Sequence, residues 1–312
     1  MKKLVFSFAI GTVLLFMACE NDEVVPASDY ATVDFNVTTE SLLTTDAAVE
    51  DVIEATDYEI ELYTGTVEMM EELSVATVND DQLKSTTDER FGDRYRLGRP
   101  DITVDWTDGD YPRTVTLDYG EETELSNGRI ISGIIEIEVS APLYQEGATR
   151  TISFTDFSVD SLIINGTIQK ELVSVSDERE IVIVRDLTIT IPEGTEIEYY
   201  AEISRIWDEG LGTPFYLGDD VLLITGYATC FDSDGNEYRR EITEKLQKQG
   251  GCRFLVSGKV DYSNNGEVFA TIDYGDGTCD NVAEYSSAEG TKEFIIGKRI
   301  RKYRSNQNQA GE

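Results

Sequence analysis

Residues 181–203, IVIVRDLTITIPEGTEIEYYAEI, alternate apolar and polar side chains on either side of one turn signal. The apolar residues before that signal share one face of an extended chain, and they are Ile181, Ile183, Leu187, Ile189 and Ile191. Those after it do the same, and they are Ile197, Tyr199, Ala201 and Ile203. Pro192-Glu193-Gly194 between them is typical of a tight turn. A period of two on both sides of a short turn predicts an antiparallel β-hairpin with one buried face.

The same period recurs along the chain from Asp101 onward. Ile135, Ile137 and Val139, for example, alternate with glutamates. Turn signals separate such runs, and they are Asn127-Gly128, Asn165-Gly166, Asp234-Gly235-Asn236, Asn264-Asn265-Gly266 and Gly275-Asp276-Gly277. About a dozen strands without a helical crossover predict a mainly β fold, which is an antiparallel meander, a sandwich or an incomplete barrel. We assign residues 101–297 to this β-domain.

One slip interrupts the alternation. Ile152 and Phe154 are followed by Phe157 and Val159, so the inward positions move by one residue. A β-bulge near Thr155-Asp156 explains this slip, because a bulge inserts one extra residue into a strand.

Short units of the β-domain occur more than once. Asp-Tyr-Gly stands at residues 118–120 and again at 273–275. Ile-Ser-Gly-Ile at 131–134 is similar to Val-Ser-Gly-Lys at 256–259, and Ile-Thr-Gly at 224–226 is a looser version. Duplication of a hairpin module and convergent turn chemistry both account for these echoes.

A short helical segment is expected before the β-domain, over residues 39–78. Its apolar residues recur mostly at spacings of three, four and seven, and they are Leu42, Leu43, Val49, Val52, Ile53, Ile60 and Tyr63. This spacing indicates an amphipathic helix with Asp46 and residues 50–54 on its solvent face. A second short helix or turn is expected over residues 67–75, and residues 79–100 form a connection. We expect the helix to pack on the sheet or to act as a stalk. Binding a partner is the alternative role.

The composition excludes several classes of function. The 312 residues include 61 Asp and Glu, 26 Lys and Arg and no histidine, for a formal net charge of −35. Without histidine there is no imidazole base, no Ser-His-Asp triad and no His-containing zinc site. The negative charge repels phosphate backbones, so no nucleic-acid partner is expected. Hydrophobic residues make up 40% of the chain, which is enough for a folded core.

The first residues carry the features of a bacterial secretory signal, which we assign to residues 1–18. Lys2 and Lys3 precede an apolar stretch that is too short to span a bilayer comfortably. Ala18 then stands directly before Cys19, as signal peptidase II requires. The segment resembles a lipobox, with Phe16 where leucine is usual, so we expect a lipid anchor on Cys19. The alternative is an ordinary secretory signal with an incidental cysteine.

Residues 20–23, Glu-Asn-Asp-Glu, follow this cysteine directly. They resemble the export signal that sends lipoproteins of the Bacteroidota to the outer face of the outer membrane. Composition alone indicates a solvated acidic tether, which we place at residues 19–38. The expected location is therefore the outer membrane, with the protein anchored on the extracellular face. The periplasmic face is the alternative.

Three cysteines remain for an oxidising compartment, Cys230, Cys252 and Cys279. If Val260 faces Val268, Cys252 lies at the mouth of the turn at residues 275–277, where the chain brings Cys279 back. We therefore expect a Cys252–Cys279 disulfide, worth about 3 kcal/mol, with Cys230 buried and left over. A thiol metal site is a poor alternative, because no Cys-x-x-Cys spacing is present.

The chain from Asp101 onward resembles an uncharacterised family of β-rich Bacteroidota lipoproteins. The matching segments are residues 118–120, 127–129, 132–133, 151–154, 165–166, 224–226, 252–254 and 273–280. The most specific of them is the C-terminal block, in which a cysteine is followed by DYGDGTCD. Relatives often carry a cysteine soon after the first Asp-Tyr-Gly, and here residues 121–123 are Glu-Glu-Thr. The resemblance implies location and architecture and carries no activity.

Residues 207–216, WDEGLGTPFY, form the most promising candidate for a ligand loop. Its aromatic side chains, from Trp207, Phe215 and Tyr216, are of the kind that stacks on sugar rings. The alternative is that they cap one end of the hydrophobic core.

Three other segments carry local signals. Asp160-Ser161-Leu162 resembles the O-glycosylation motif of Bacteroidota, with Ser161 as the acceptor. Residues 232–237 lack the ligand spacing of an EF-hand, so a hairpin turn is expected there in preference to a calcium site. Residues 298–312 form a basic and polar tail that pairs loosely with the acidic body, and the alternative is a handle for an anionic partner.

Three functions are compatible with these features. The first is a non-enzymatic surface lipoprotein that binds an extracellular glycan or a partner protein. The second is a structural or envelope-assembly lipoprotein of the periplasm. The third is a glycoside hydrolase, because such enzymes need two carboxylates and no histidine. We assign no catalytic, cofactor-binding or metal-ligating residue, no cofactor and no oligomeric state. An aromatic-lined groove near Trp207 would favour the first function over the second.

Overall fold

The computed structural model describes residues 37–65, 98–106, 111–125, 128–174, 179–192, 194–211, 217–232, 235–252 and 254–295. Several predictions concern residues outside these ranges. They are the signal and tether with Cys19, the second helix at 67–75, the ligand-loop residues Phe215 and Tyr216, and the basic tail.

Fourteen antiparallel strands form one open sheet within the described residues. They are β1 (Asp101–Trp106), β2 (Arg113–Asp118), β3 (Thr123–Glu124), β4 (Ile130–Val139), β5 (Thr149–Val159), β6 (Leu162–Ser174), β7 (Arg179–Thr190), β8 (Glu196–Glu209), β9 (Val221–Phe231), β10 (Glu237–Gln249), β11 (Leu255–Asn264), β12 (Glu267–Asp276), β13 (Val282–Ser287) and β14 (Gly290–Ile295). Nearly every strand pairs with the next along the chain, while β2 pairs with β4 and the short β3 adds to β4. The predicted β fold is confirmed, and its form is the open meander.

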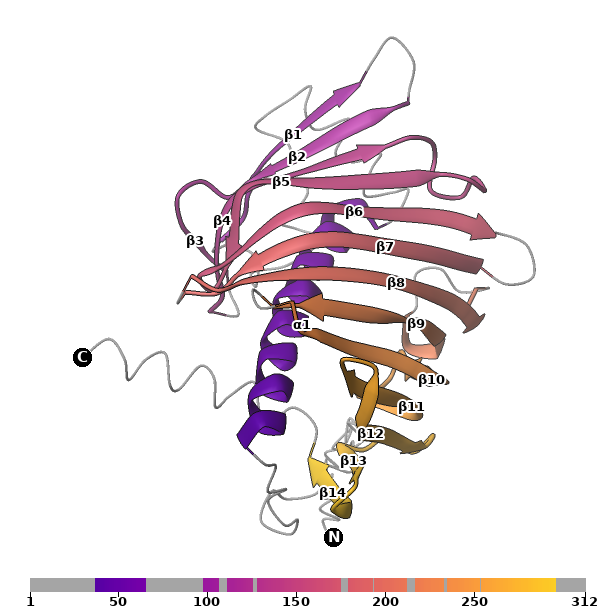
Figure 1. Ribbon diagram of the computed structural model, residues 1–312. Helices are drawn as coiled ribbons and strands as arrows, with labels where there is room; N and C mark the ends of the chain where they lie inside the picture. The colour runs from indigo at the N-terminus through magenta and orange to yellow at the C-terminus, as the bar shows by residue number, and fades with distance from the viewer. Residues whose placement is uncertain are drawn as a thin grey trace, which may run out of the picture.

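One helix, α1 (Val37–Thr64), crosses the concave side of this sheet (Figure 1). Glu61 near its C-terminal end contacts β5 and β6, whereas Glu50, three turns earlier, contacts β8 and β10. A helix rises about 1.5 Å per residue, and strands are spaced about 4.8 Å apart. The helix therefore passes one strand about every three residues, as expected for an axis perpendicular to the strands.

The curled sheet buries α1 around most of its circumference over residues 48–64, the part whose side chains are described. Its apolar residues belong to the same core as inward residues of β2 to β9, and the most buried are Val49, Val52, Ile53 and Ile60, at most 3% exposed. Of its described side chains, Glu54 and Tyr58 are exposed. The expectation that the helix packs on the sheet is therefore confirmed.

The prediction that the acidic face of the helix lies in solvent is confirmed for Glu54 and wrong for Glu50 and Asp51, while the side chain of Asp46 lies outside the described residues. Glu54 is exposed, but Glu50 pairs with Arg240 of β10 at 2.8 Å, and Asp51 pairs with Arg129. The physical reason is that the sheet supplies basic partners on its inward face. A helix with cations on the opposing surface can bury its carboxylates as ion pairs.

Four glycines inside strands bend the sheet: Gly133, Gly166, Gly226 and Gly258. Each has a φ between +79° and +122°, which L side chains rarely adopt. A Cβ at any of them would lie 2.0 to 2.3 Å from a backbone carbonyl oxygen of the adjacent strand. Three of the four follow Ser or Thr. The repeated Ser/Thr-Gly units at residues 132–133, 225–226 and 257–258 therefore mark a repeated bend.

The turn predicted at Asn165-Gly166 is wrong. Asn165-Gly166 lies inside β6, where Gly166 approaches the Asp186 carbonyl of β7. The turn between β5 and β6 is instead Asp160-Ser161, whose φ angles of 49° and 75° match a type I′ hairpin turn.

The β-bulge predicted at Thr155-Asp156 is confirmed. Asp156 has a φ of 49°, and the pairing of β5 with both neighbouring strands shifts register around it.

The predicted register of the β11–β12 hairpin is also wrong. Val260 pairs with Ile272, and Val268 pairs with Ser263. The two-residue turn at Asn265-Gly266 sets Asn264 opposite Glu267, and two further irregularities then shift the pairing. The turn, together with these shifts, therefore determines the register, and apolar matching along the strands does not.

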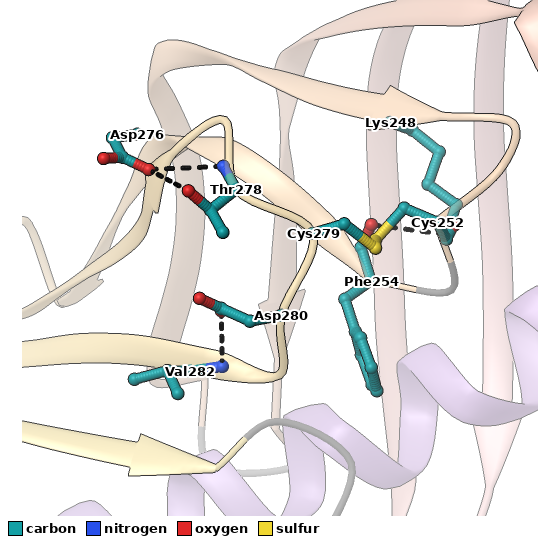
Figure 2. The surroundings of a disulfide bond; sticks show 8 residues. All are labelled: Lys248, Cys252, Phe254, Asp276, Thr278, Cys279, Asp280 and Val282. Carbon is teal, nitrogen blue, oxygen red and sulfur yellow. Dashed lines mark hydrogen bonds between the residues drawn. A yellow bond between two sulfur atoms is a disulfide. The ribbon is translucent and has the colours of Figure 1, made fainter. Parts of the chain in front are cut away.

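The predicted disulfide forms nevertheless. Cys252 and Cys279 are joined across the loops before β11 and after β12, with 5.7 Å between their Cα atoms (Figure 2). Side chains hold both loops in place: Lys248 donates to the Cys252 carbonyl at 2.7 Å, and the Asp276 carboxylate accepts from the Thr278 hydroxyl at 2.8 Å. Cys230 lies half-buried in β9, outside this bond.

Candidate functional site

Charged side chains of α1 and of the sheet meet beneath the helix. Asp57 is central: Lys170 Nζ lies 2.9 Å from its Oδ1, Arg185 donates to its Oδ2, and Arg205 lies 3.4 Å from the same oxygen. Burial opposes ionisation of Asp57, but the charges of Arg185, Lys170 and Arg205 outweigh it and hold the pKa of the carboxyl far below its usual range. The carboxylate is therefore charged at any physiological pH.

One turn further along, Glu61 forms a second junction. Arg150 donates from Nη1 to Oε2 at 3.0 Å and from Nη2 to Oε1 at 2.9 Å, and Lys170 donates to Oε1 at 2.9 Å. Burial raises the pKa of Glu61, but Lys170 and Arg150 together lower it to about 2. The Glu61 side chain is still 38% exposed, because it opens into a cavity.

We call this cavity the helix-end pocket, and its volume is about 180 Å³. The end of α1, the β4–β5 and β8–β9 connections and the strands β5 to β8 supply its wall. The lining residues are Glu61, Gly65, Leu143, Ala148, Arg150, Lys170, Leu172, Arg179, Ile181, Trp207, Gly210, Leu211 and Asp220. Apolar and charged groups therefore share one partly open cavity, as in many ligand sites.

Trp207 and Arg179 form one wall of the helix-end pocket. They are directly paired residues of β8 and β7, and the guanidinium carbon lies 5.0 Å from the centroid of the indole ring, a cation–π distance. Arg179 Nε is buried and has no hydrogen-bond partner among the described residues. Burial lowers the pKa of Arg179 and the neighbouring Arg150 adds to that effect, against the opposing charges of Glu61 and Asp220.

Asp220 completes this wall. Its carboxylate is hydrogen bonded to Trp207, and Gly210 packs so closely that a Cβ there would lie 2.1 Å from Asp220 Oδ1. Burial raises the pKa of Asp220 and Asp219 adds to the shift, while Trp207 and Arg179 oppose it. Gly210 thus lies against Asp220 because glycine leaves room for the carboxylate.

The structure separates the residues that the sequence singled out. Trp207 lines the helix-end pocket, as a ligand-binding residue should. Ser161 is exposed in the β5–β6 turn and does not line the pocket, and the Cys252–Cys279 bond belongs to the β11–β12 hairpin.

Sequence reasoning missed the charged residues of the pocket. A signal for two of the network cations was present, because Lys170 stands between Ile168 and Leu172 on the inward face of β6, and Arg185 likewise interrupts the apolar alternation of β7. A charge at an inward strand position indicates a buried ion pair or a site. Nothing local marked Glu61 or Asp220.

Two other findings apply to the described part of the chain. It contains no group of three or more Cys, Asp or Glu side chains placed to hold a metal ion. No helix in it is both long enough and apolar enough to cross a membrane.

Comparison with protein-family models, with curated proteins and with solved structures found no match for this chain.

Proposed function

We propose that this protein is a lipid-anchored outer-membrane protein that binds an extracellular glycan in the helix-end pocket. The observation that carries the proposal is the position of Trp207, which lines a cavity together with hydrogen-bonding charged groups. An aromatic ring beside a few convergent polar groups is the usual composition of a sugar or cofactor site.

The size of the pocket limits the ligand. Its volume of about 180 Å³ is below the roughly 300 Å³ at which pockets for drug-sized molecules begin. A single terminal sugar unit fits such a space better than a chain lying along a groove. The apolar wall of Leu143, Leu172 and Leu211 faces the sugar carbons, and the charged groups serve its hydroxyls.

A glycan array tests the binding role. The full chain, purified in mild detergent, is applied to the array beside its Trp207→Ala and Tyr200→Ala variants. Tyr200 lies on the same strand and is 38% exposed on the opposite face of the sheet, so it is the matched aromatic control. We expect a terminal-sugar signal that disappears in Trp207→Ala and persists in Tyr200→Ala. No signal with the unaltered chain, or equal loss in both variants, would reject the proposal.

The location rests on the sequence of the first residues, and the disulfide supports it. A Cys252–Cys279 bond persists in oxidising compartments such as the periplasm and the cell surface. Protease treatment of intact cells should remove the protein, and a Cys19→Ala variant should no longer fractionate with membranes. Protection until the outer membrane is permeabilised would indicate the periplasmic face and an envelope role.

One observation favours a second candidate, a carboxylate-based glycoside hydrolase. Glu61 and Asp220 line the same pocket, and their pKa values are displaced in opposite directions, as in an acid and base pair. Glu61 is held by Arg150 and Lys170, however, and this pairing leaves its carboxylate little basicity. Release of p-nitrophenol from p-nitrophenyl glycosides, abolished by both Glu61→Gln and Asp220→Asn, would favour hydrolysis over binding.

A further inference from the structure

We propose that the helix-end pocket recognises a carboxylated sugar, of the hexuronic acid class, with the sugar carboxylate on the Arg179 guanidinium. This inference rests on the proposed function and specifies its ligand. Three observations lead to it: the charge balance of the pocket lining, the unpartnered Nε of Arg179, and the carboxylate of Asp220 beside Trp207.

The charge balance of the helix-end pocket differs from that of the whole chain. The formal net charge of the protein is −35. Around Asp57 and Glu61, by contrast, four cations gather, and they are Arg150, Lys170, Arg185 and Arg205. Arg179 adds a further cation at the pocket wall, partly offset by Asp220. Arg185 and Arg205 do not line the pocket, but its lining still has three cations, Arg150, Lys170 and Arg179, against the two carboxylates of Glu61 and Asp220. This small formal surplus of positive charge in an acidic protein favours an anionic ligand there.

Arg179 is the cation of the pocket with a side-chain donor that no described residue engages. Glu61 already engages Arg150 and Lys170 through three hydrogen bonds. The buried Nε of Arg179, in contrast, has no hydrogen-bond partner among the described residues. A buried donor without a partner costs free energy, which a ligand acceptor recovers.

The position of Arg179 suits a carboxylate. Its guanidinium lies over the Trp207 ring at a cation–π distance, and a contact of this kind uses none of the hydrogen-bond donors. A guanidinium presents paired donors that match the two oxygens of a carboxylate. The repulsion between Arg150 and Arg179 would also be relieved by an anion bound in the pocket.

The remaining groups suit the rest of a sugar. Asp220, which is hydrogen bonded to Trp207 and lines the same pocket, can accept a hydrogen bond from a sugar hydroxyl. The exposed surface of the indole and the neighbouring leucines provide apolar contact for the ring carbons. A small carboxylate without a ring would leave this part of the pocket unused.

Isothermal titration calorimetry with methyl glucuronide and methyl galacturonide as probes tests the inference, with the matched methyl glucoside and galactoside as neutral probes. The full chain in detergent is compared with Arg179→Gln and with Arg239→Gln. Arg239 is the matched control, because its guanidinium also lies over an aromatic ring, Tyr227 at 3.9 Å, but on the opposite face of the sheet. Thermal unfolding of each variant confirms that it is folded.

We expect one of the uronides to bind at least tenfold more tightly than its neutral counterpart. Arg179→Gln should weaken that binding by about tenfold to a hundredfold, the usual range for a charge-assisted hydrogen bond, while Arg239→Gln leaves it unchanged. Arg179→Lys should give an intermediate loss, because lysine keeps the charge and loses the paired donors.

Four results would overturn the inference. Equal binding of uronide and neutral sugar, with no effect of Arg179→Gln, would leave the proposed function standing with a neutral ligand. Tighter binding of a sulfated methyl galactoside than of either uronide would change the anion class. Uronide binding that is lost in Trp207→Ala but kept in Arg179→Gln would reject the role of Arg179. No binding of any probe, together with an empty glycan array, would reject the proposed function as well.

Discussion

At the residue scale, Asp57 is the charge on which the helix–sheet contact depends most. Its carboxylate is 8% exposed and is shared by Lys170, Arg185 and Arg205. Asp57→Asn leaves these cations without their main counter-charge in a buried place, and breaking a buried pair in this way costs about 3–5 kcal/mol. We expect a loss of that size in the free energy of unfolding, measured by urea denaturation at pH 7.

Glu54→Gln is the control for this substitution. Glu54 lies on the same helix, three residues away, and is exposed. Its removal should change the free energy of unfolding by less than about 0.5 kcal/mol. Similar values for the two variants would mean that the ion pairs beneath the helix do not stabilise the fold.

Glu61 gives the helix–sheet contact a defined pH dependence. The pKa of Glu61 is about 2 in the folded protein, against an ordinary value of 4.5. Between these values the folded state binds fewer protons than the unfolded state, so its stability falls as the pH falls. The stability difference between the unaltered protein and Glu61→Gln should therefore be complete above pH 4.5 and shrink towards pH 2. Urea denaturation at a series of pH values measures it, and a constant difference would contradict the assignment.

The pKa of Glu59 is displaced in the opposite direction to that of Glu61, so its contribution to stability has the opposite pH dependence. Burial raises its pKa, and the Tyr119 hydroxyl, which donates to its carboxylate at 2.6 Å, only partly offsets that rise. Stability from this group is complete below pH 4.5 and is lost as the pH rises through its folded pKa. Tyr119→Phe removes the donor, so its cost in unfolding free energy should be larger at pH 7 than at pH 4. An equal cost at both pH values would show that Glu59 does not ionise there.

At the element scale, the strand-interior glycines determine how the sheet curls. Gly226 has a φ of +122°, and a Cβ there would lie 2.0 Å from the Glu202 carbonyl oxygen of β8. Gly266 has a φ of +82° in an open turn, with nothing within 4 Å. Gly266→Ala should therefore cost about 1–2 kcal/mol for backbone strain alone. Gly226→Ala adds a steric clash to that strain, and we expect at least about 2 kcal/mol more, measured by thermal and urea unfolding. Equal costs would show that the sheet relaxes around the bend.

The disulfide is a second element-scale constraint. It closes a loop with a sequence separation of 27 residues across the β11–β12 hairpin, for which the chain-entropy relation gives about 3.5 kcal/mol. A Cys252→Ser, Cys279→Ser double variant should lose stability by about that amount and should unfold identically with and without reductant. Cys230→Ser, in contrast, should remain sensitive to reductant, because Cys230 lies outside the bond. Reductant sensitivity in the double variant would point to a different pairing.

The elements also show how far sequence can predict this structure. The alternation from Asp101 onward predicts the strands, because a half-buried strand needs period two and little else. Asn165-Gly166 was mistaken for a turn because a glycine that bends a strand and a glycine that ends it need the same positive φ. The β11–β12 register was missed because its shifts depend on backbone irregularities that apolar matching does not reveal.

The candidate site was predictable only in part, for a related reason. Trp207 could be found because an aromatic residue in a Gly-rich segment is a local signal. The ion network could not, since its partners are far apart in the chain: Asp57 and Arg185 are separated by 128 residues. The periodicity of α1 therefore predicts Glu50 and Asp51 in solvent, whereas they pair with Arg240 and Arg129.

At the scale of the whole molecule, opposite charges are sorted by location. The chain carries a formal net charge of −35, yet cations concentrate on the concave face of the sheet beneath α1. The rest of the chain therefore carries the excess negative charge, and like charges repel one another and oppose compaction. The helix and the concave face attract each other within a buried region, where salt screens charges much less than it does in solvent.

This arrangement predicts that salt stabilises the fold. Raising NaCl from 0.01 M to 0.5 M shortens the Debye length from about 30 Å to a few Å, which screens surface repulsion strongly and the buried pairs weakly. We expect the free energy of unfolding to rise by an amount on the order of 1 kcal/mol in this range. Urea denaturation at fixed pH 7 across the salt series measures it. A decrease in the free energy of unfolding with salt would mean that exposed ion pairs, such as Lys259 with Glu244 at 2.8 Å, stabilise the fold by more than surface repulsion destabilises it.

The Asp57→Asn variant separates the effect of the buried ion pairs from that of the surface charges. It removes a buried charge, so its stability should keep the same salt dependence as that of the unaltered protein.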